Sequence, residues 1–137
     1  MKPTGYSGTP LAKKLGLKNG DKIRLINQPV HYLDLFDTLP EIEEVKSKKT
    51  KKNFIHVFVK ELKELEKCIV ALRGEILPDG IIWVSWMKKS AGISTDITED
   101  RIRDLALKNG LVDVKVCAID NTWSGLKLVI RLKDRKK

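Results

Sequence analysis

Cysteine is scarce in this chain, and long hydrophobic runs are missing. The two cysteines, Cys68 and Cys117, are too few and too far apart for a zinc site or a disulfide framework, so we expect reduced thiols and no metal. No apolar stretch approaches the roughly 20 residues of a membrane-spanning helix. The first residues, Met1-Lys2-Pro3-Thr4-Gly5-Tyr6, lack the apolar core of a signal peptide. These absences favour a cytoplasmic protein without a membrane segment.

Acidic residues are outnumbered, and the excess positive charge is concentrated in two segments. The net charge is +9, from 27 Lys and Arg against 18 Asp and Glu. One segment is the lysine run at 46–52, and the other is the C-terminal stretch 131–137. Two flexible basic segments indicate weak, non-specific attraction to phosphate rather than specific recognition of nucleic acid. The candidates for such contacts are Lys48, Lys49, Lys51 and Lys52.

The chain length of 137 residues predicts a single domain, residues 1–137, with three irregular segments. Glycine, proline and serine near the N-terminus make residues 1–8 a flexible arm. Residues 46–53 are expected to form a basic loop. Residues 134–137 are expected to form a basic tail.

The most hydrophobic stretch, residues 81–87, predicts a central strand. It is apolar except for Ser85, and Leu77-Pro78-Asp79-Gly80 precedes it as a tight turn. A short run rich in β-branched and aromatic residues is typical of a strand that is covered on both faces. Helices on both faces of a sheet imply a three-layer α/β fold.

Hydrophobic periodicity predicts the remaining elements. Helices are expected at 10–15, at 31–39, at 61–73 with Gly74 as the C-terminal cap, and from Asp96 to Asn109-Gly110. The other strands are expected at 22–26, 41–46, 54–59, 112–119 and 126–133. Within 112–119, the alternation places Val112, Val114, Val116 and Ala118 on one face.

The last two strands are predicted to form an antiparallel hairpin, because the roughly six residues between them are too few for a parallel crossover. The predicted strand order is 41–46, 22–26, 54–59, 81–87, 126–133, 112–119. Only strand 126–133 is expected to be antiparallel.

Catalytic motifs are missing as well. His56 lies between Phe54 and Phe58 on a buried strand, and we interpret it as a structural histidine with hydrogen bonds in the core; a role as a base is the alternative. His31 stands at a helix start, and no serine or cysteine nucleophile has a visible partner. Gly5-Tyr6-Ser7-Gly8-Thr9 is interpreted as an ordinary capped helix start rather than an anion-binding loop.

Three stretches, 54–59, 72–86 and 112–132, follow each other as strand, helix, Leu-Pro-Asp-Gly turn, strand, helix and hairpin. This order resembles the C-terminal half of class I S-adenosylmethionine-dependent methyltransferases. In that fold the final strand turns back antiparallel and inserts beside the strand that is 81–87 here. The resemblance implies a three-layer, Rossmann-like, mostly parallel sheet with an antiparallel C-terminal strand.

Most of the chain also resembles a family of small bacterial proteins of unknown function. The matching stretches are 5–16, 77–89, 112–120 and 122–130. This second resemblance implies no particular activity.

The loop after the first strand departs from the methyltransferase pattern. Those enzymes place a glycine-rich turn there, which lets the backbone approach the cofactor. Here the loop reads Asn27-Gln28-Pro29-Val30, which has no glycine and contains a proline without an N–H donor. An acidic residue usually ends the second strand to hold the ribose, but Glu43 and Glu44 do not fall at a predicted strand end. We therefore expect no bound cofactor.

Aromatic, basic and hydroxyl side chains are expected to meet at the carboxyl ends of the strands, where ligands bind in open α/β sheets. The candidate ligand-binding residues are Asn27, Gln28, Trp86, Lys88, Lys89, Ser90, Trp123 and Ser124. If this rim is functional, both tryptophans should be only partly buried. The alternative is that the tryptophans close the core and the lysines are solvated.

These patterns favour a non-catalytic, methyltransferase-like module that binds an anionic ligand or a protein partner at the strand-end rim. One alternative is a methyltransferase with an atypical cofactor site, which the glycine-poor loop disfavours. Another alternative is an accessory protein that binds nucleic acid non-specifically through its lysine runs.

Overall fold

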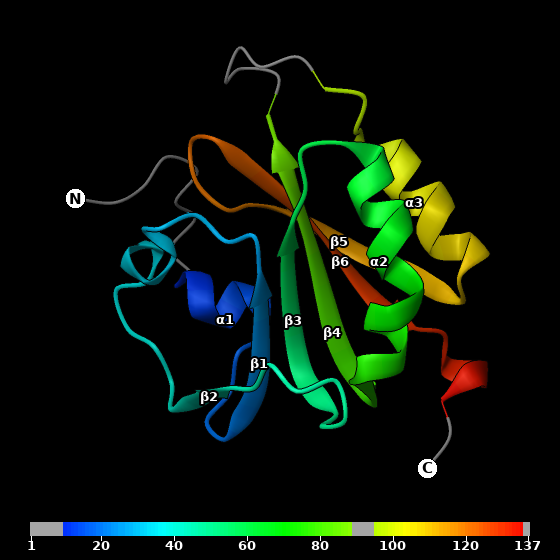
Figure 1. The fold of residues 1–137 in the computed structure, drawn as a ribbon. Coiled ribbons are helices and arrows are strands. Elements are labelled where there is room, and N and C mark those ends of the chain that lie inside the picture. Colours follow the sequence, from blue (N-terminus) through cyan, green and yellow to red (C-terminus); the bar gives the residue numbers. More distant parts are fainter. Residues whose placement is uncertain (1–9, 89–94, 136–137) are drawn as a thin grey trace.

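The structure, a computed structural model, describes residues 10–88 and 95–135 (Figure 1). The expected arm at 1–8, the candidates Lys89 and Ser90, and the last two residues of the basic tail lie outside these ranges. In chain order the elements, with η for a 3-10 helix, are α1 (Leu11–Leu15), β1 (Asp21–Ile26), η1 (Tyr32–Leu35), β2 (Ile42–Glu44), β3 (Lys52–Phe58), α2 (Leu62–Glu75), β4 (Ile76–Met87), α3 (Glu99–Lys108), β5 (Leu111–Ala118), β6 (Trp123–Ile130) and η3 (Leu132–Asp134).

The strands form one six-stranded sheet in the order β2-β1-β3-β4-β6-β5. β1 is parallel to β2 and β3, and β3 is parallel to β4. β6 is antiparallel to both of its neighbours, β4 and β5. The predicted strand order, the C-terminal hairpin and the single antiparallel strand are confirmed, and with them the Rossmann-like α/β fold class.

Helices cover both faces of the sheet, as the hydrophobic run at 81–87 predicts (Figure 1). On one face, Ile82 and Val84 of β4 pack in the same core cluster as the apolar sides of α2 and α3. On the other face, Trp83 packs with α1 and η1. Its indole Nε1 donates a hydrogen bond to the Leu15 carbonyl oxygen at 2.8 Å, which attaches α1 to the centre of the sheet. The two-sided burial of β4 therefore determines where all three helices lie.

β4 is longer than predicted because the chain stays extended through Leu77-Pro78-Asp79-Gly80. Lys52 lies opposite Ile76, and the next paired residue of β4 is Ile81, so the segment between forms a bulge in the ladder. A Cβ at Gly80 would lie 2.9 Å from the Ile76 Cβ and 3.1 Å from the Lys52 carbonyl oxygen, so only glycine fits without a shift. The predicted tight turn is thus a bulge inside a longer strand.

Three predicted helix boundaries are wrong. The helix expected at 31–39 is only the single turn η1, and the backbone is already extended at Phe36. α2 continues through Gly74 to Glu75 and passes directly into β4. The side chain that caps α3 is Thr98, which accepts a hydrogen bond from the Arg101 N–H at 3.2 Å. Asp96 instead accepts from the backbone N–H of Leu62 and so connects the start of α2 to the chain before α3.

β5 does not keep the predicted alternation. A register shift between Asp113 and Lys115 breaks the ladder with β6. Val114 and Val116 are exposed as a result, and Cys117 is buried against the face that carries α1. The expected apolar face of Val112, Val114, Val116 and Ala118 is therefore wrong, because a bulge resets the side-chain period of two.

Both cysteines are free thiols. Burial raises the pKa of Cys68 and of Cys117. Among the described residues, no helix is both long and apolar enough to cross a membrane.

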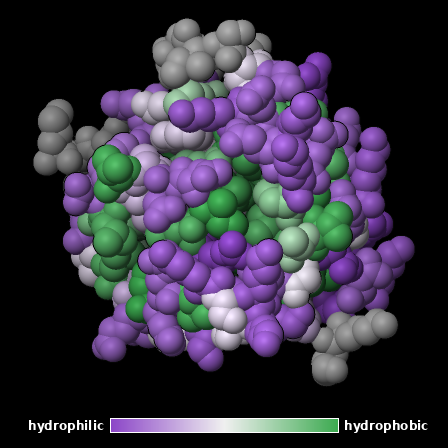
Figure 2. Space-filling model, in the orientation of Figure 1, coloured by the Kyte–Doolittle hydropathy of each residue, from purple (hydrophilic) through white to green (hydrophobic). Residues whose placement is uncertain are grey.

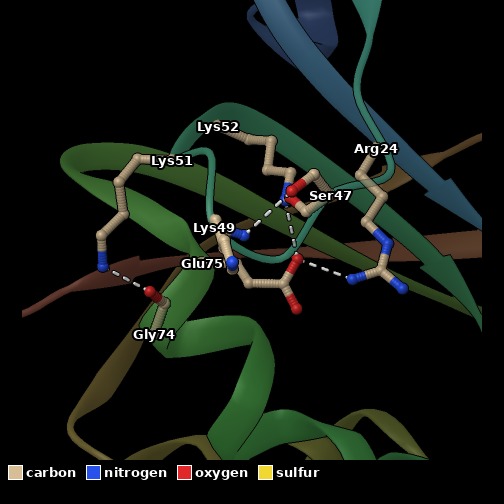
Figure 3. Close-up of polar contacts among 7 residues, drawn as sticks. All are labelled: Arg24, Ser47, Lys49, Lys51, Lys52, Gly74 and Glu75. Carbon is tan, nitrogen blue, oxygen red and sulfur yellow. Dashed lines mark hydrogen bonds and ion pairs between the residues drawn. The ribbon is translucent and has the colours of Figure 1, made fainter.

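A buried ion pair joins β3 to α2, with an arginine from β1 beside it (Figure 3). The Lys52 side chain is fully buried, and its Nζ lies 2.9 Å from Glu75 Oε1. Arg24 Nη1 donates to the same carboxylate oxygen at 2.6 Å. Lys52 also donates to the Ser47 carbonyl oxygen. Burial alone would raise the pKa of Glu75, but hydrogen bonds from Lys52 and Arg24 outweigh it and hold that pKa below its ordinary value.

Two members of the lysine run are therefore engaged within the fold. Lys52 is buried and unavailable at the surface, so its interpretation as a solvated phosphate contact is wrong. Lys51 Nζ donates to the Gly74 carbonyl oxygen at 2.5 Å, near the C-terminus of α2. Lys48 and Lys49 are exposed, and they stay candidates for weak, non-specific contacts with nucleic acid.

We predict that Glu75→Gln destabilises the protein by about 3–5 kcal/mol at pH 7, because Lys52 is left buried without its counter-charge. The folded-state pKa of Glu75 is depressed, so its stabilising contribution is present above the unfolded pKa and is lost as the pH falls through the folded value. Urea unfolding of the variant and the parent at several pH values measures both effects. Glu66→Gln on the exposed side of α2 is the matched control, and an equal loss in both variants would contradict the assignment.

Candidate functional site

A cavity of about 500 Å³ lies against β1 and β2, beneath η1. Its lining is mostly apolar and includes Ile23, Leu25, Val30, Tyr32, Leu33 and Ile42. A single 3-10 turn, rather than the expected full helix, lies over this end of the sheet, and its residues Tyr32 and Leu33 line the cavity. Val30 and Leu33 are exposed at its mouth, and Figure 2 shows hydrophobic side chains at the surface on the side where η1 lies.

Two polar side chains, Gln28 and Glu44, also line this cavity. Glu44 is the last residue of β2, and it pairs with Ile23 of β1. Side chains alternate along a strand, so Glu44 shares the cavity face with Ile42 whereas Glu43 points to the opposite face. The expectation that neither glutamate ends the second strand is wrong for Glu44, because β2 stops two residues earlier than predicted.

The chain turns sharply after β1 through Asn27, whose φ is 57°. Asparagine is one of the few residues besides glycine that tolerate this left-handed conformation. The loop thus makes the turn without a glycine, and the following residue, Gln28, reaches the cavity. Pro29 also lines the cavity but has no N–H to offer a ligand.

A chain of three buried polar side chains lies next to the cavity. The Tyr32 hydroxyl is 2.9 Å from His56 Nδ1, and His56 Nε2 is 2.6 Å from Ser85 Oγ. The Phe58 ring stacks on the imidazole with centroids 4.3 Å apart. Burial lowers the pKa of His56 to about 3 and raises the pKa of Tyr32, so both groups are neutral near pH 7. The interpretation of His56 as a hydrogen-bonded core histidine is confirmed.

The three hydrogen-bonded side chains Tyr32, His56 and Ser85 are not arranged for nucleophilic catalysis. His56 and Ser85 are fully buried, and only Tyr32 lines the cavity. A base with a pKa near 3 takes up little proton at neutral pH. The neutral chain supports the cavity wall and leaves Gln28 and Glu44 as the polar groups that could contact a ligand.

The predicted rim tryptophans do not come together. In the β4–β6 ladder Trp86 pairs with Ser124, and Trp123 pairs with Met87. The two indoles therefore point to opposite faces of the sheet, and each packs in a different core cluster. Trp86 is 9% exposed and Trp123 is 7% exposed, so they close the core, as the alternative interpretation states.

The other rim candidates are separated from the cavity. Lys88 Nζ donates to the Asp120 carbonyl oxygen at 2.6 Å, which fixes it to the β5–β6 turn. Ser124 is half-buried in β6, and Lys89 and Ser90 lie outside the described residues. Of the six candidates that the structure describes, only Gln28 lines the cavity against β1, with Asn27 next to it in the chain.

Sequence reasoning missed Glu44 and Tyr32 as parts of a site. The signal for Glu44 was the acidic pair Glu43 and Glu44 near the second strand, but assigning Glu44 to the site required the exact end of that strand.

His31 contacts a carboxylate from another part of the chain: its Nε2 lies 3.4 Å from Asp120 Oδ2. Within residues 10–88 and 95–135, no group of three or more His, Cys, Asp and Glu side chains is placed to hold a metal ion.

We predict that His56 contributes a pH-dependent part of the stability. Its folded-state pKa is lowered from 6.5 to about 3, so the unfolded chain binds a proton that the folded chain excludes. The contribution is present above pH 6.5 and is lost as the pH falls toward 3. Between pH 6.5 and 5 the parent should lose about 2 kcal/mol more than His56→Gln, in denaturant unfolding followed by circular dichroism. Parallel pH dependence in the two proteins would show that His56 is not buried as a neutral base.

Comparison with known proteins identifies the fold. No protein-family model and no curated protein matches this chain. Among solved structures, a SAM-dependent methyltransferase from Aquifex aeolicus is 16% identical, with a TM-score of 0.60 over 88% of this chain and 87% of that one. Ribosomal protein L11 methylase from Lactobacillus delbrueckii subsp. bulgaricus is 11% identical, with a TM-score of 0.58 over 88% and 74%. The glycopeptide N-methyltransferase MtfA, complexed with sinefungin, is 10% identical, with a TM-score of 0.55 over 88% and 90%. The chain therefore has the fold of S-adenosylmethionine-dependent methyltransferases.

Proposed function

We propose that this protein is a non-catalytic, methyltransferase-like module that binds a small nucleoside-type molecule in the cavity between β1, β2 and η1. The observation that carries the proposal is the position of Glu44. Among the described residues that line this apolar cavity it is the one carboxylate, and it ends the strand next to β1. The cavity of about 500 Å³ is within the usual range for small-molecule sites.

The lining determines the chemistry of the ligand. Apolar walls from Ile23, Leu25 and Ile42 favour a flat or apolar body. A carboxylate accepts hydrogen bonds and repels anions, so Glu44 favours a ligand with hydroxyl or amino donors. Gln28 can both donate and accept. A base attached to a sugar diol satisfies these requirements, and an anionic group at this position does not.

The fold comparison supports a nucleoside as the kind of ligand. MtfA is complexed with sinefungin, and NcsB1, an O-methyltransferase from neocarzinostatin biosynthesis with a TM-score of 0.60, is in complex with S-adenosylmethionine. Both of these ligands contain adenosine. In this protein the apolar walls, Gln28 and Glu44 offer contacts for the adenosine half of such a ligand.

A methyltransferase with an atypical cofactor site is the second candidate. Two observations favour it: Asn27 turns the chain with a positive φ, and Glu44 ends β2. The loop Asn27-Gln28-Pro29-Val30 separates the two candidates. It has no glycine, and Pro29 removes one backbone donor, so we expect weak contacts with the methionyl half of the cofactor.

We predict that adenosine binds and that S-adenosylmethionine binds no more tightly. Isothermal titration calorimetry with both compounds measures this difference. Affinity for S-adenosylmethionine at least about tenfold above that for adenosine, equivalent to about 1.4 kcal/mol, would favour the methyltransferase instead. Binding of neither compound would refute a nucleoside site.

The residue test uses two neighbouring glutamates on opposite faces of β2. Glu44→Gln should weaken adenosine binding by about tenfold, because a hydrogen bond to a charged acceptor becomes a neutral one. Glu43→Gln removes the same charge but faces away from the cavity, so it should leave the affinity unchanged. Equal affinity for both variants would mean that the ligand does not contact Glu44.

A further inference from the structure

A second cavity, of about 530 Å³, lies at the amino end of β4, beside the C-terminus of α2 and η3. It is distinct from the cavity against β1 and β2, because no residue lines both. Its apolar wall includes Ile76, Pro78 and Ile130. Its charged lining consists of Lys51, Arg73, Lys133 and Asp134.

The charges of this lining are unbalanced. Among the described lining residues Asp134 is the one carboxylate, and its Oδ2 lies 3.7 Å from Nε of Arg131, which does not line the cavity. Lys51 donates to the Gly74 carbonyl oxygen (Figure 3), which offsets the partial negative charge of the α2 C-terminus. Within residues 10–88 and 95–135, Arg73 and Lys133 have no ion-pair partner. Among the described residues of the lining, three cations therefore face one carboxylate that is already paired.

Arg73 provides the second, independent observation. Its Nε is buried and makes no hydrogen bond. Within residues 10–88 and 95–135, only one other buried side-chain nitrogen or oxygen atom lacks a hydrogen-bond partner, and it is Nε of Arg131, whose ion-pair partner Asp134 lines the same cavity. Burying a donor without an acceptor costs about 1–3 kcal/mol, so such groups in a native protein need an explanation.

The guanidinium group of Arg73 is held in place by the backbone rather than by hydrogen bonds. Gly110, which follows α3, has no side chain, and a Cβ there would lie 2.8 Å from Arg73 Nε. The group therefore packs directly over the backbone at Gly110. An arginine that served only the α2 helix end would be expected to bond to the last carbonyl oxygens, but Lys51 bonds to one of them and Arg73 to none.

We propose that this cavity binds the phosphate group of a small molecule, with Arg73 as the central contact and Lys133 as a second cation. A phosphate offers several acceptors, and an arginine fork meets them in a planar, bidentate arrangement. The apolar wall of Ile76, Pro78 and Ile130 leaves space for an organic body. This site does not depend on the nucleoside cavity. An anionic ligand was expected at the carboxyl ends of the strands, whereas this site lies at the amino end of β4.

The test compares ribose 5-phosphate, ribose and inorganic phosphate, each titrated into the full-length protein and followed by amide shifts in two-dimensional NMR. Ribose 5-phosphate should bind and shift the amides of Gly74 and Gly110, whereas ribose should not. Tighter binding of ribose 5-phosphate than of inorganic phosphate identifies an organic phosphate as the ligand. Equal binding of the two supports the same site with a free oxyanion as its ligand. Equal binding of ribose and ribose 5-phosphate would overturn the proposal.

Two matched variants distinguish binding at a specific site from non-specific attraction of phosphate to the positively charged protein. Arg73→Gln should weaken ribose 5-phosphate binding at least about tenfold, a loss typical of a charge-assisted bidentate contact. Lys67→Gln removes the same charge from an exposed position on the same helix and should leave binding within twofold. Equal losses in the Arg73 and Lys67 variants would refute the site.

Thermal unfolding without ligand tests the structural alternative. Because Arg73 Nε is unpaired, Arg73→Gln should unfold at the same temperature as the parent or at a higher one. A lower unfolding temperature together with unchanged ribose 5-phosphate binding would show that Arg73 only stabilises the end of α2, and the proposal would be wrong.

Discussion

The burial of β4 on both faces is the constraint on which the rest of the structure depends. Ile82, Trp83 and Val84 are completely inaccessible to solvent, and each fully buried side chain of this kind stabilises the fold by about 1.5–3 kcal/mol. Alternation sends Trp83 toward α1 and its two neighbours toward α2 and α3. Ser85 is the one polar residue in this buried part of the strand, and it is accommodated because His56 hydrogen-bonds to it. The three helices are arranged around this part of β4, whose side chains are buried on both faces of the sheet.

The strand order could be predicted because it depends on composition and loop length, whereas the sites depend on register and exact strand ends. Periodicity at 31–39 could not distinguish a full helix from one turn followed by extended chain. The opposite orientation of Trp86 and Trp123 follows from a pairing offset of one residue, which composition does not determine. Lys52 looked like one more solvated lysine, because its partner, Glu75, lies 23 residues further along the chain.

Both cavities arise where the fold lacks a covering element. At β1 and β2, a single turn stands where the periodicity predicted a helix, and the space beneath it is apolar with one carboxylate. At the amino end of β4, the glycine after α3 leaves room that an arginine enters without finding a hydrogen-bond partner. The two linings differ in charge, so they select ligands of different chemistry. The first favours donors and the second favours acceptors.

The hydrogen-bonded chain of Tyr32, His56 and Ser85 has a directional consequence. A neutral imidazole has one donating and one accepting nitrogen, so both hydroxyl groups cannot donate to His56 at once. If Tyr32 donates to Nδ1, Nε2 donates to Ser85; if Ser85 donates, the order of all the donors is reversed. The tautomer of one buried ring thus sets the orientation of hydroxyl protons on two separate elements, and Tyr32 carries this orientation to the edge of the cavity.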